Sequence, residues 1–193
     1  MRTESINYDL QPLNPIYIRP AVDGDVPVLQ DLIDRSFKVL ARGYYSPRQM
    51  ASALHYVVGL DRRLILDGTY YAACLGEEVI ACGGWSIRRD EIGTHMEWVP
   101  ASNRRCPGRD PAIIRAVFVA PEYARRGIGA KLVARVEADA AECGFRRAEL
   151  LATLSGESAY KRYGYQVVKS EDLTLPDGVV VRSTRMSKML DNQ

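Results

Sequence analysis

The sequence contains no long hydrophobic run and almost no excess of charge. None of its uninterrupted apolar stretches approaches the roughly 18 residues that a membrane-spanning helix needs. Its 26 Lys and Arg residues nearly balance 24 Asp and Glu residues, and a net charge of +2 is too small for a protein dedicated to nucleic acid or a membrane surface. The polar N-terminus lacks the apolar segment and the cleavage site of a signal peptide. We therefore expect a soluble, cytoplasmic protein whose partners include no nucleic acid and no membrane.

Cysteine is also scarce. The four residues Cys74, Cys82, Cys106 and Cys143 are spaced unlike a zinc ribbon, a redox pair or a secreted disulfide framework. Cys74 and Cys82 fall within apolar, strand-like runs and Cys143 ends a helix, which favours small buried side chains over catalytic thiols. We predict four reduced thiols and no metal site.

The remaining composition is that of a globular protein. Hydrophobic residues make up 47% of the chain and charged residues 26%, which excludes disordered, collagen-like and coiled-coil classes. A length of 193 residues indicates a single domain. We place this domain at residues 16–193, after a flexible leader at residues 1–15.

Hydrophobic periodicity predicts alternating strands and helices. Asp23 is a candidate N-cap for a first helix, and Ser46 with Pro47 and Gln49 forms a capping box for a second helix. The expected strands are 16–19, 69–75, 79–87, 113–119, 147–153, 165–169 and 179–189, and the expected helices are 23–41, 47–57, 127–143 and 156–163. A long irregular connection, 88–111, separates the third and fourth strands. This order suits a mixed sheet flanked by helices.

The segment after the fourth strand has the composition of an anion site. Arg125 and Arg126 precede Gly127 and Gly129, at the expected start of a helix. A helix N-terminus offers unpaired N–H groups and a partial positive charge, and arginine side chains add fixed cations. Taken alone, the same residues also fit a solvated turn with packing glycines. The spacing excludes a P-loop, and the third glycine of the dinucleotide-binding fingerprint is missing.

The run Ala124-Arg125-Arg126-Gly127-Ile128-Gly129 resembles the signature [RQ]-x-x-G-x-[GA] of the GCN5-related N-acetyltransferase (GNAT) superfamily. The resemblance extends over residues 16–168 and includes the opening 16–21, Cys82-Gly83-Gly84-Trp85, and the run 159–165. The first signature position is Ala124 in place of Arg or Gln, which removes one side chain and leaves its backbone N–H. Arg125 and Arg126 are the residues that would compensate.

The resemblance implies a fold and a donor. The fold is mixed α/β, a twisted sheet of about six to seven strands flanked by about four helices, with a splayed central strand pair. The donor is acetyl-CoA. Val117, Phe118 and Val119 would align its pantetheine arm and thioester, and Arg125, Arg126, Gly127, Ile128, Gly129 and Ala130 would bind its pyrophosphate. Ser155 and Ser158 are further candidates for contact with coenzyme A, or alternatively caps of the helix that follows.

Acetyl transfer to an amine also requires proton transfer. By the resemblance, Tyr160 is the acid that protonates the departing thiolate; the alternative for this tyrosine is simple packing. Glu97 and Glu149 are the candidate bases, and Glu149 could equally pair with Arg147. His95 is a second-rank candidate for the base. His55 is a single histidine within a helix, and we expect it to serve packing or the surface.

The sequence says least about the acceptor, the molecule that would receive the acetyl group. Its site would be lined by the first two helices, by Trp85 and by the connection 88–111, where Arg104, Arg105 and Arg109 form a positive cluster. That cluster could attract an acidic substrate or a phosphate of coenzyme A, or it could be a solvated loop. We expect a small-molecule amine as the acceptor. Protein amines, a non-catalytic acyl-CoA sensor and a homodimer remain open alternatives.

Overall fold

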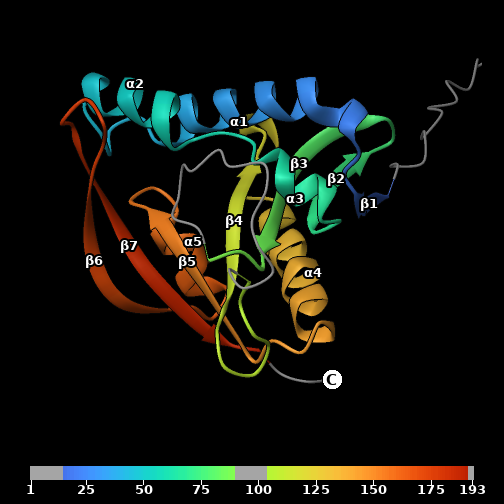
Figure 1. Ribbon diagram of the computed structural model, residues 1–193. Coiled ribbons are helices and arrows are strands. Elements are labelled where there is room, and N and C mark those ends of the chain that lie inside the picture. Colours follow the sequence, from blue (N-terminus) through green and yellow to red (C-terminus); the bar gives the residue numbers. More distant parts are fainter. Residues whose placement is uncertain (1–14, 90–103, 191–193) are drawn as a thin grey trace, which may run out of the picture.

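The computed structural model describes residues 15–89 and 104–190, and it places seven strands in one mixed sheet (Figure 1). The order across the sheet is β1-β2-β3-β4-β5-β7-β6, and among these neighbours only β4 and β5 run parallel. The strands are β1 (Ile16–Pro20), β2 (Tyr70–Leu75), β3 (Glu78–Ser86), β4 (Ala112–Val119), β5 (Arg147–Thr153), β6 (Gln166–Thr174) and β7 (Val180–Met189). The helices are α1 (Val26–Leu40), α2 (Pro47–Tyr56), α3 (Arg62–Leu66), α4 (Ile128–Glu142) and α5 (Glu157–Arg162). The predicted fold class is therefore confirmed. The leader at residues 1–15, apart from Pro15, lies outside the described residues.

The helix starts follow local side-chain chemistry. In α2 the predicted capping box is present, because Ser46 accepts from the Gln49 backbone N–H at 3.3 Å and the Gln49 side chain accepts from Ser46 N–H at 3.0 Å. The predicted cap at Asp23 is wrong: a 3-10 turn covers Asp23–Asp25, and Asp25 precedes α1. The short helix α3 was not predicted, and Asp61 caps it by accepting a backbone N–H at 3.1 Å.

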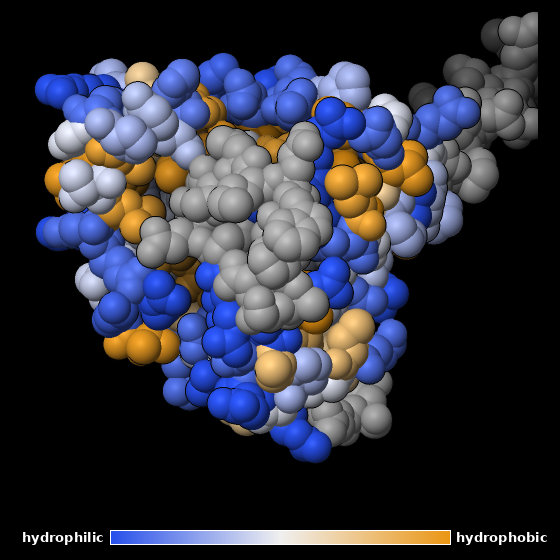
Figure 2. All heavy atoms as spheres, viewed as in Figure 1, coloured by the Kyte–Doolittle hydropathy of each residue, from blue (hydrophilic) through white to orange (hydrophobic). Residues whose placement is uncertain are grey.

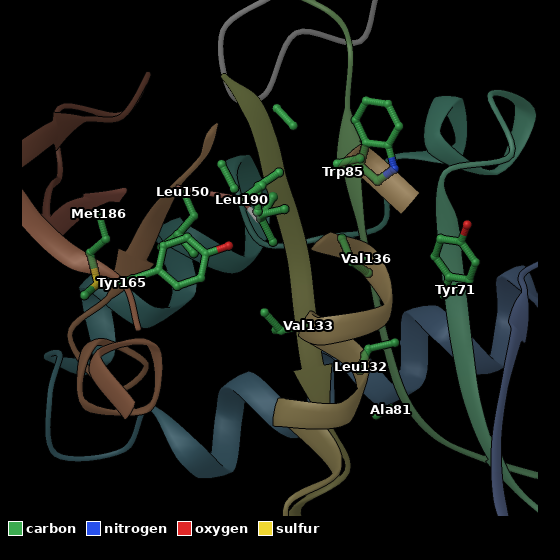
Figure 3. Packing of buried hydrophobic residues seen from close by; sticks show 14 of the residues in the cluster. Tyr71, Ala81, Trp85, Leu132, Val133, Val136, Leu150, Tyr165, Met186 and Leu190 are labelled. Atoms are coloured by element: carbon green, nitrogen blue, oxygen red, sulfur yellow. The ribbon is translucent and has the colours of Figure 1, made fainter. Parts of the chain in front are cut away.

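Helices cover both faces of the sheet. Helices α4 and α5 pack on one face over a shared cluster of buried side chains, and α1, α2 and α3 pack on the other face over two further clusters. Figure 3 shows Val133 and Val136 of α4 between Tyr165 on one side and Trp85 on the other. The apolar faces predicted for the helices are thus turned to the sheet, and the sheet is the scaffold on which both sides of a site can be built.

Strand β4 contains a β-bulge opposite Gly83. Arg115 pairs with Gly84 and Phe118 pairs with Cys82, so two residues of β4 face the single residue Gly83. Ala116 within the bulge has a φ of 50°, a left-handed value that costs a non-glycine residue roughly 1 kcal/mol or more. The Tyr70 hydroxyl donates to the Ala116 carbonyl at 2.9 Å and holds this conformation. The bulge bends β4 along its length.

Strands β4 and β5 pair over only two residues and then separate. Ala112 pairs with Ala148 and Ile113 pairs with Glu149, and no further pair joins the two strands within the described residues. In Figure 1 the strands diverge from this point towards their last residues. We call the point after Ile113 and Glu149 the strand fork. The splayed central pair implied by the resemblance is therefore present.

The outer strands are held by charged side chains. Strand β6 ends at Thr174, beyond the predicted end at residue 169, and its side chains are mostly exposed. Arg185 of β7 bonds Glu171 at 2.8 Å, and Arg182 bonds Asp172 at 3.0 Å. The second half of β6 is hydrophilic and does not alternate with apolar residues. The hydrophobic pattern therefore predicted an end at residue 169 instead of Thr174.

The surface shows no broad apolar belt in the view of Figure 2, where hydrophobic residues are scattered among hydrophilic ones. No helix in residues 15–89 or 104–190 is long and apolar enough to cross a membrane. All four cysteines are free, and Cys74 and Cys82 are buried as predicted. Cys106 is exposed, and the burial predicted for Cys143 is wrong, because this residue lies exposed at the C-cap position of α4.

Candidate active site

The edge of β4 that faces β5 is the first component of the site. Beyond the strand fork, β4 pairs with β3 and has no sheet partner on its other side among the residues described. Val117 and Val119 pack against the α4 side of the core and Phe118 against the α1 side. The side chains thus belong to the core, while the backbone edge can accept and donate hydrogen bonds to an extended, amide-bearing ligand.

The segment from Ala124 to Ala130, which we call the anion loop, is the second component. Arg125 has a φ of 62° and Gly127 a φ of 81°, and Gly127 occupies the N-cap position of α4 without a side-chain cap. Left-handed residues in such a turn bring successive backbone N–H groups to one side, and the first turn of α4 adds its own. Arg125 and Arg126 are exposed beside them, and the Arg126 guanidinium lies 5.5 Å from the centre of the Tyr123 ring.

Helix α5 meets the start of α4 through Tyr163. The Tyr163 hydroxyl lies 2.9 Å from the position that a β-carbon would take at Gly129. Only glycine leaves room for this contact, so Gly129 serves close packing as well as access to the backbone. The sequence favours packing for Tyr163, but its contact with Gly129 was not predicted.

Tyr160 lies in α5 on the same face of the sheet as α4. Its partly buried ring makes edge contacts with the rings of Tyr163 at 5.9 Å and Tyr165 at 5.6 Å. Burial raises the pKa of the Tyr160 phenol, so it stays protonated at neutral pH. Its hydroxyl makes no hydrogen bond to the residues that the structure describes, and its role as the acid stays a prediction.

Tyr45, in the connection between α1 and α2, binds the residue that follows the last residue of β5. Its hydroxyl accepts from the Leu154 backbone N–H at 2.8 Å and donates to the Arg182 carbonyl at 2.9 Å. These bonds link the residue after β5 to β7, which lies on the side of β5 away from β4. A lone tyrosine in a short polar connection gave no sequence signal for this role.

The two serines lie in the connection after β5 and at the start of α5. The Ser155 hydroxyl lies 3.1 Å from the Thr153 hydroxyl, and Ser158 is exposed on α5. Neither caps the helix: its N-cap position is Gly156, whose N–H donates to Thr153 Oγ1 at 3.2 Å. The capping alternative was wrong for both serines, and their contact with a ligand stays a prediction.

Glu149 lies at the strand fork on the face opposite to Tyr160. Its carboxylate lies 3.5 Å from Arg147 Nε and 3.6 Å from Arg185 Nη1, so the predicted pairing with Arg147 is present. The other candidate base, Glu97, and His95 lie outside the described residues. His55 is in α2, where its ring stacks edge-on against Tyr56.

Trp85 belongs to the core. It is 2% exposed, its indole N–H donates to Asp139 of α4 at 2.6 Å, and its ring packs on Phe145. The packing alternative for this residue is confirmed, and Trp85 does not face the side of the sheet on which Glu149 lies.

Comparison with known proteins agrees with this geometry. The acetyltransferase (GNAT) family model matches residues 33–165. A GCN5-related N-acetyltransferase from Rhodopseudomonas palustris has a TM-score of 0.66 at 19% identity, covering 92% of this chain and 98% of that one. The PaiA N-acetyltransferase of Thermoplasma acidophilum, solved with coenzyme A, has a TM-score of 0.61 at 16% identity, covering 91% and 99%.

A third solved structure, yncA of Salmonella typhimurium with its cofactor acetyl-CoA, has a TM-score of 0.59 at 16% identity and covers 93% of this chain and 96% of that one. At these identities the likeness shows the fold. A search of curated protein sequences found no match. Because the family model spans more than half of the chain, the protein belongs to the acetyltransferase (GNAT) family.

Proposed function

We propose that this protein transfers the acetyl group of acetyl-CoA to a primary amine, most simply that of a small molecule, in a direct ternary complex. The observation that carries the proposal is the unpaired edge of β4 beside β5, which leads directly into the anion loop at the start of α4. Solved relatives of this fold were crystallised with coenzyme A or acetyl-CoA, which supports the same donor here.

Each part of the donor has a matching part of the site. The diphosphate fits the N–H groups of the anion loop and the Arg125 and Arg126 side chains, because both helix termini and guanidinium groups favour anions. The amides of the pantetheine arm fit the free edge of β4 at Val117 and Val119. The acetyl thioester would then lie towards the strand fork.

The chemistry needs two proton transfers. The amine nitrogen attacks the thioester carbonyl carbon, the carbon–sulfur bond breaks, and Tyr160 gives its proton to the leaving thiolate. A base takes the proton that the amine loses, and Glu149 at the strand fork is the candidate among the described residues. A backbone N–H of β4 at Val117 or Val119 would stabilise the oxyanion.

The proposal also keeps the location expected from the sequence. Four unpaired cysteines favour a reducing compartment such as the cytoplasm. A homodimer remains a prediction that the single chain does not test.

Release of free thiol from acetyl-CoA on addition of amines tests the proposal. The Tyr160→Phe variant should bind acetyl-CoA as the unmodified protein does and release thiol about 100-fold more slowly. Binding of acetyl-CoA without any amine-dependent thiol release, across small amines and peptide amines, would favour a non-catalytic acyl-CoA sensor instead.

A further inference from the structure

Positive side chains gather at the strand fork on the face covered by α1, α2 and α3. Arg115 of β4, Arg147 of β5 and Arg185 of β7 lie there, with Arg105 in the segment before β4. In Figure 2 strongly hydrophilic residues lie below the grey atoms in the view, in the region where Figure 1 shows the connection into β4 and the start of β5. We call these four side chains the arginine cluster.

The carboxylates near the cluster are shared among its cations. Asp61 lies 3.1 Å from Arg115 Nη1 and also 2.7 Å from Arg63 Nη2. Glu149 lies between Arg147 and Arg185. Among the side chains that the structure describes here, each of these carboxylates is shared by two cations, so the described part of the site carries more positive than negative charge, although the net charge of the whole chain is only +2.

Glu171, the second carboxylate beside Arg185, is shared in the same way. It bonds Arg185 Nε at 2.8 Å and Lys169 Nζ at 2.8 Å, so it too serves two cations. The excess of positive charge around the strand fork is therefore not cancelled by this neighbour.

Among the residues that the structure describes, Arg105 is the member of the cluster without a carboxylate partner. Its Nε donates to the Arg88 carbonyl at 3.1 Å, and no described carboxylate lies within ion-pair distance of it. Its side chain is half-buried. Partial burial lowers the pKa of Arg105, while the more distant Asp110 and Glu149 act in the opposite direction. A half-buried guanidinium with free N–H groups is costly unless an anion completes it.

The cluster lies where the acceptor would approach. The anion loop and Tyr160 are on the α4 face, so the donor enters from that side. The amine must then reach the thioester from the opposite face, and Glu149, the candidate base, is on that face beside the cluster. This step rests on the function proposed above.

We propose that the acceptor is an anionic amine, whose negatively charged group, a carboxylate or a phosphate, is bound by Arg105 and drawn in by Arg115 and Arg185. The charged group would rest against the guanidinium of Arg105 while its amine points into the gap between β4 and β5. Amino acids and amino phosphates are the substrate classes with this chemistry.

Matched pairs of amines test the inference. Thiol release is measured with amino acids of increasing separation between amine and carboxylate, with O-phosphoethanolamine, which has no carboxylate, as the phosphate arm, and with plain alkylamines of the same chain lengths. The anionic members should have kcat/KM values at least about tenfold higher, with the phosphate arm showing which anion is preferred.

A charge-neutral variant and a matched control sharpen the test. Arg105→Gln should raise KM for the anionic amines about 10- to 100-fold and leave the plain amines nearly unchanged. Arg109→Gln removes an exposed arginine from the same segment and should change neither. Binding of acetyl-CoA, followed separately by calorimetry, should be the same in all three proteins.

Three results would overturn the inference: preference for plain amines, equal loss of both amine classes in Arg105→Gln, or no turnover of any anionic amine by a protein that binds acetyl-CoA. Failure of acetyl-CoA to bind at all would instead overturn the proposed function. The two failures are therefore distinguishable.

Discussion

The hydroxyl of Tyr163 lies 2.9 Å from the point where Gly129 would carry a β-carbon. Gly129 is in the first turn of α4 and Tyr163 directly follows α5. This one contact couples the anion loop to the short helix that carries Tyr160. Access of a ligand to the backbone of α4 and the position of Tyr160 therefore depend on each other.

Replacing Gly129 with Ala should weaken acetyl-CoA binding about tenfold, because the new methyl group pushes the Tyr163 ring out of place. Alanine is otherwise the better helix former, so lower helix propensity would not explain a loss. Calorimetric titration measures the affinity. The double variant Gly129→Ala with Tyr163→Phe removes the hydroxyl and should regain most of the binding; an equal loss in both variants would contradict this explanation.

The pH dependence of turnover reports on Tyr160. Burial raises the pKa of its phenol above the ordinary value of about 10, and the protonated form is the active acid. Activity that depends on this proton should hold as pH rises and fall only above pH about 10. The Tyr160→Phe variant should lack that alkaline decline, whereas Tyr44→Phe, at an exposed tyrosine, should retain it. A decline near pH 8 that disappears in Tyr160→Phe would show that burial does not control this group.

The bulge in β4 depends on Gly83. A β-carbon there would lie 2.8 Å from Val117 Cγ2 and 3.1 Å from its Cα, so Gly83→Ala forces the strand to shift. We expect a loss of about 1–3 kcal/mol in the free energy of unfolding and weaker acetyl-CoA binding. Urea denaturation and calorimetry measure the two effects. Gly24→Ala is the control, since nothing lies within 4 Å of its β-carbon position; equal stability of both variants would refute the role of the bulge.

Asp25 should make stability depend on pH. Its carboxylate accepts from Arg19 at 2.7 and 2.8 Å and from the Val22 N–H at 2.8 Å, and the Arg19 hydrogen bonds lower its pKa. Because the folded pKa is lowered, the stabilisation is complete above the unfolded value of about 3.9 and is lost as pH falls through the folded value.

Asp25→Asn should therefore cost about 1–3 kcal/mol at pH 7, and the difference from the unmodified protein should shrink in acid. Thermal unfolding at several pH values provides the measurement. Asp23→Asn, whose carboxylate is exposed and pairs with Arg62, should cost less than about 1 kcal/mol. A loss for Asp25→Asn that stays constant down to pH 3 would contradict the linkage.

Most of the sheet and the long helices could be predicted from the sequence, because the apolar residues of each element recur at the spacing typical of a strand or of a helix. Strand β5 matches its predicted range, 147–153, and the Ser46 capping box marks the start of α2. Helix α3 could not be predicted, since five residues are too few to show a helical period. The Asp25 carboxylate before α1 bonds Arg19 and the Val22 N–H instead of the N–H groups of the helix, so the usual cap pattern does not reveal where α1 starts.

The anion loop and Tyr160 were found through a family signature, and the loop's physical basis is visible in its glycines and arginines. The contacts around the gap between β4 and β5 could not be predicted from the sequence. The bulge at Ala116, the hydroxyl contact of Tyr70 and the bonds of Tyr45 join residues far apart in the chain. Contacts between residues far apart in the chain produce no recognisable residue spacing in a single sequence. The arginine cluster is similar, since its four members come from different strands or connections and meet only in the folded sheet.

The most direct test of the account is a calorimetric titration of the purified protein with acetyl-CoA, beside the variant Arg126→Glu. Arg126 is exposed on the anion loop, so reversal of its charge should leave the fold intact and repel the diphosphate. The account predicts that the unmodified protein binds acetyl-CoA and that the variant binds it with an affinity weaker by about tenfold or more. No binding by the folded, unmodified protein, or equal affinity in both, would contradict the claim that acetyl-CoA binds between β4 and β5 with its diphosphate on the anion loop.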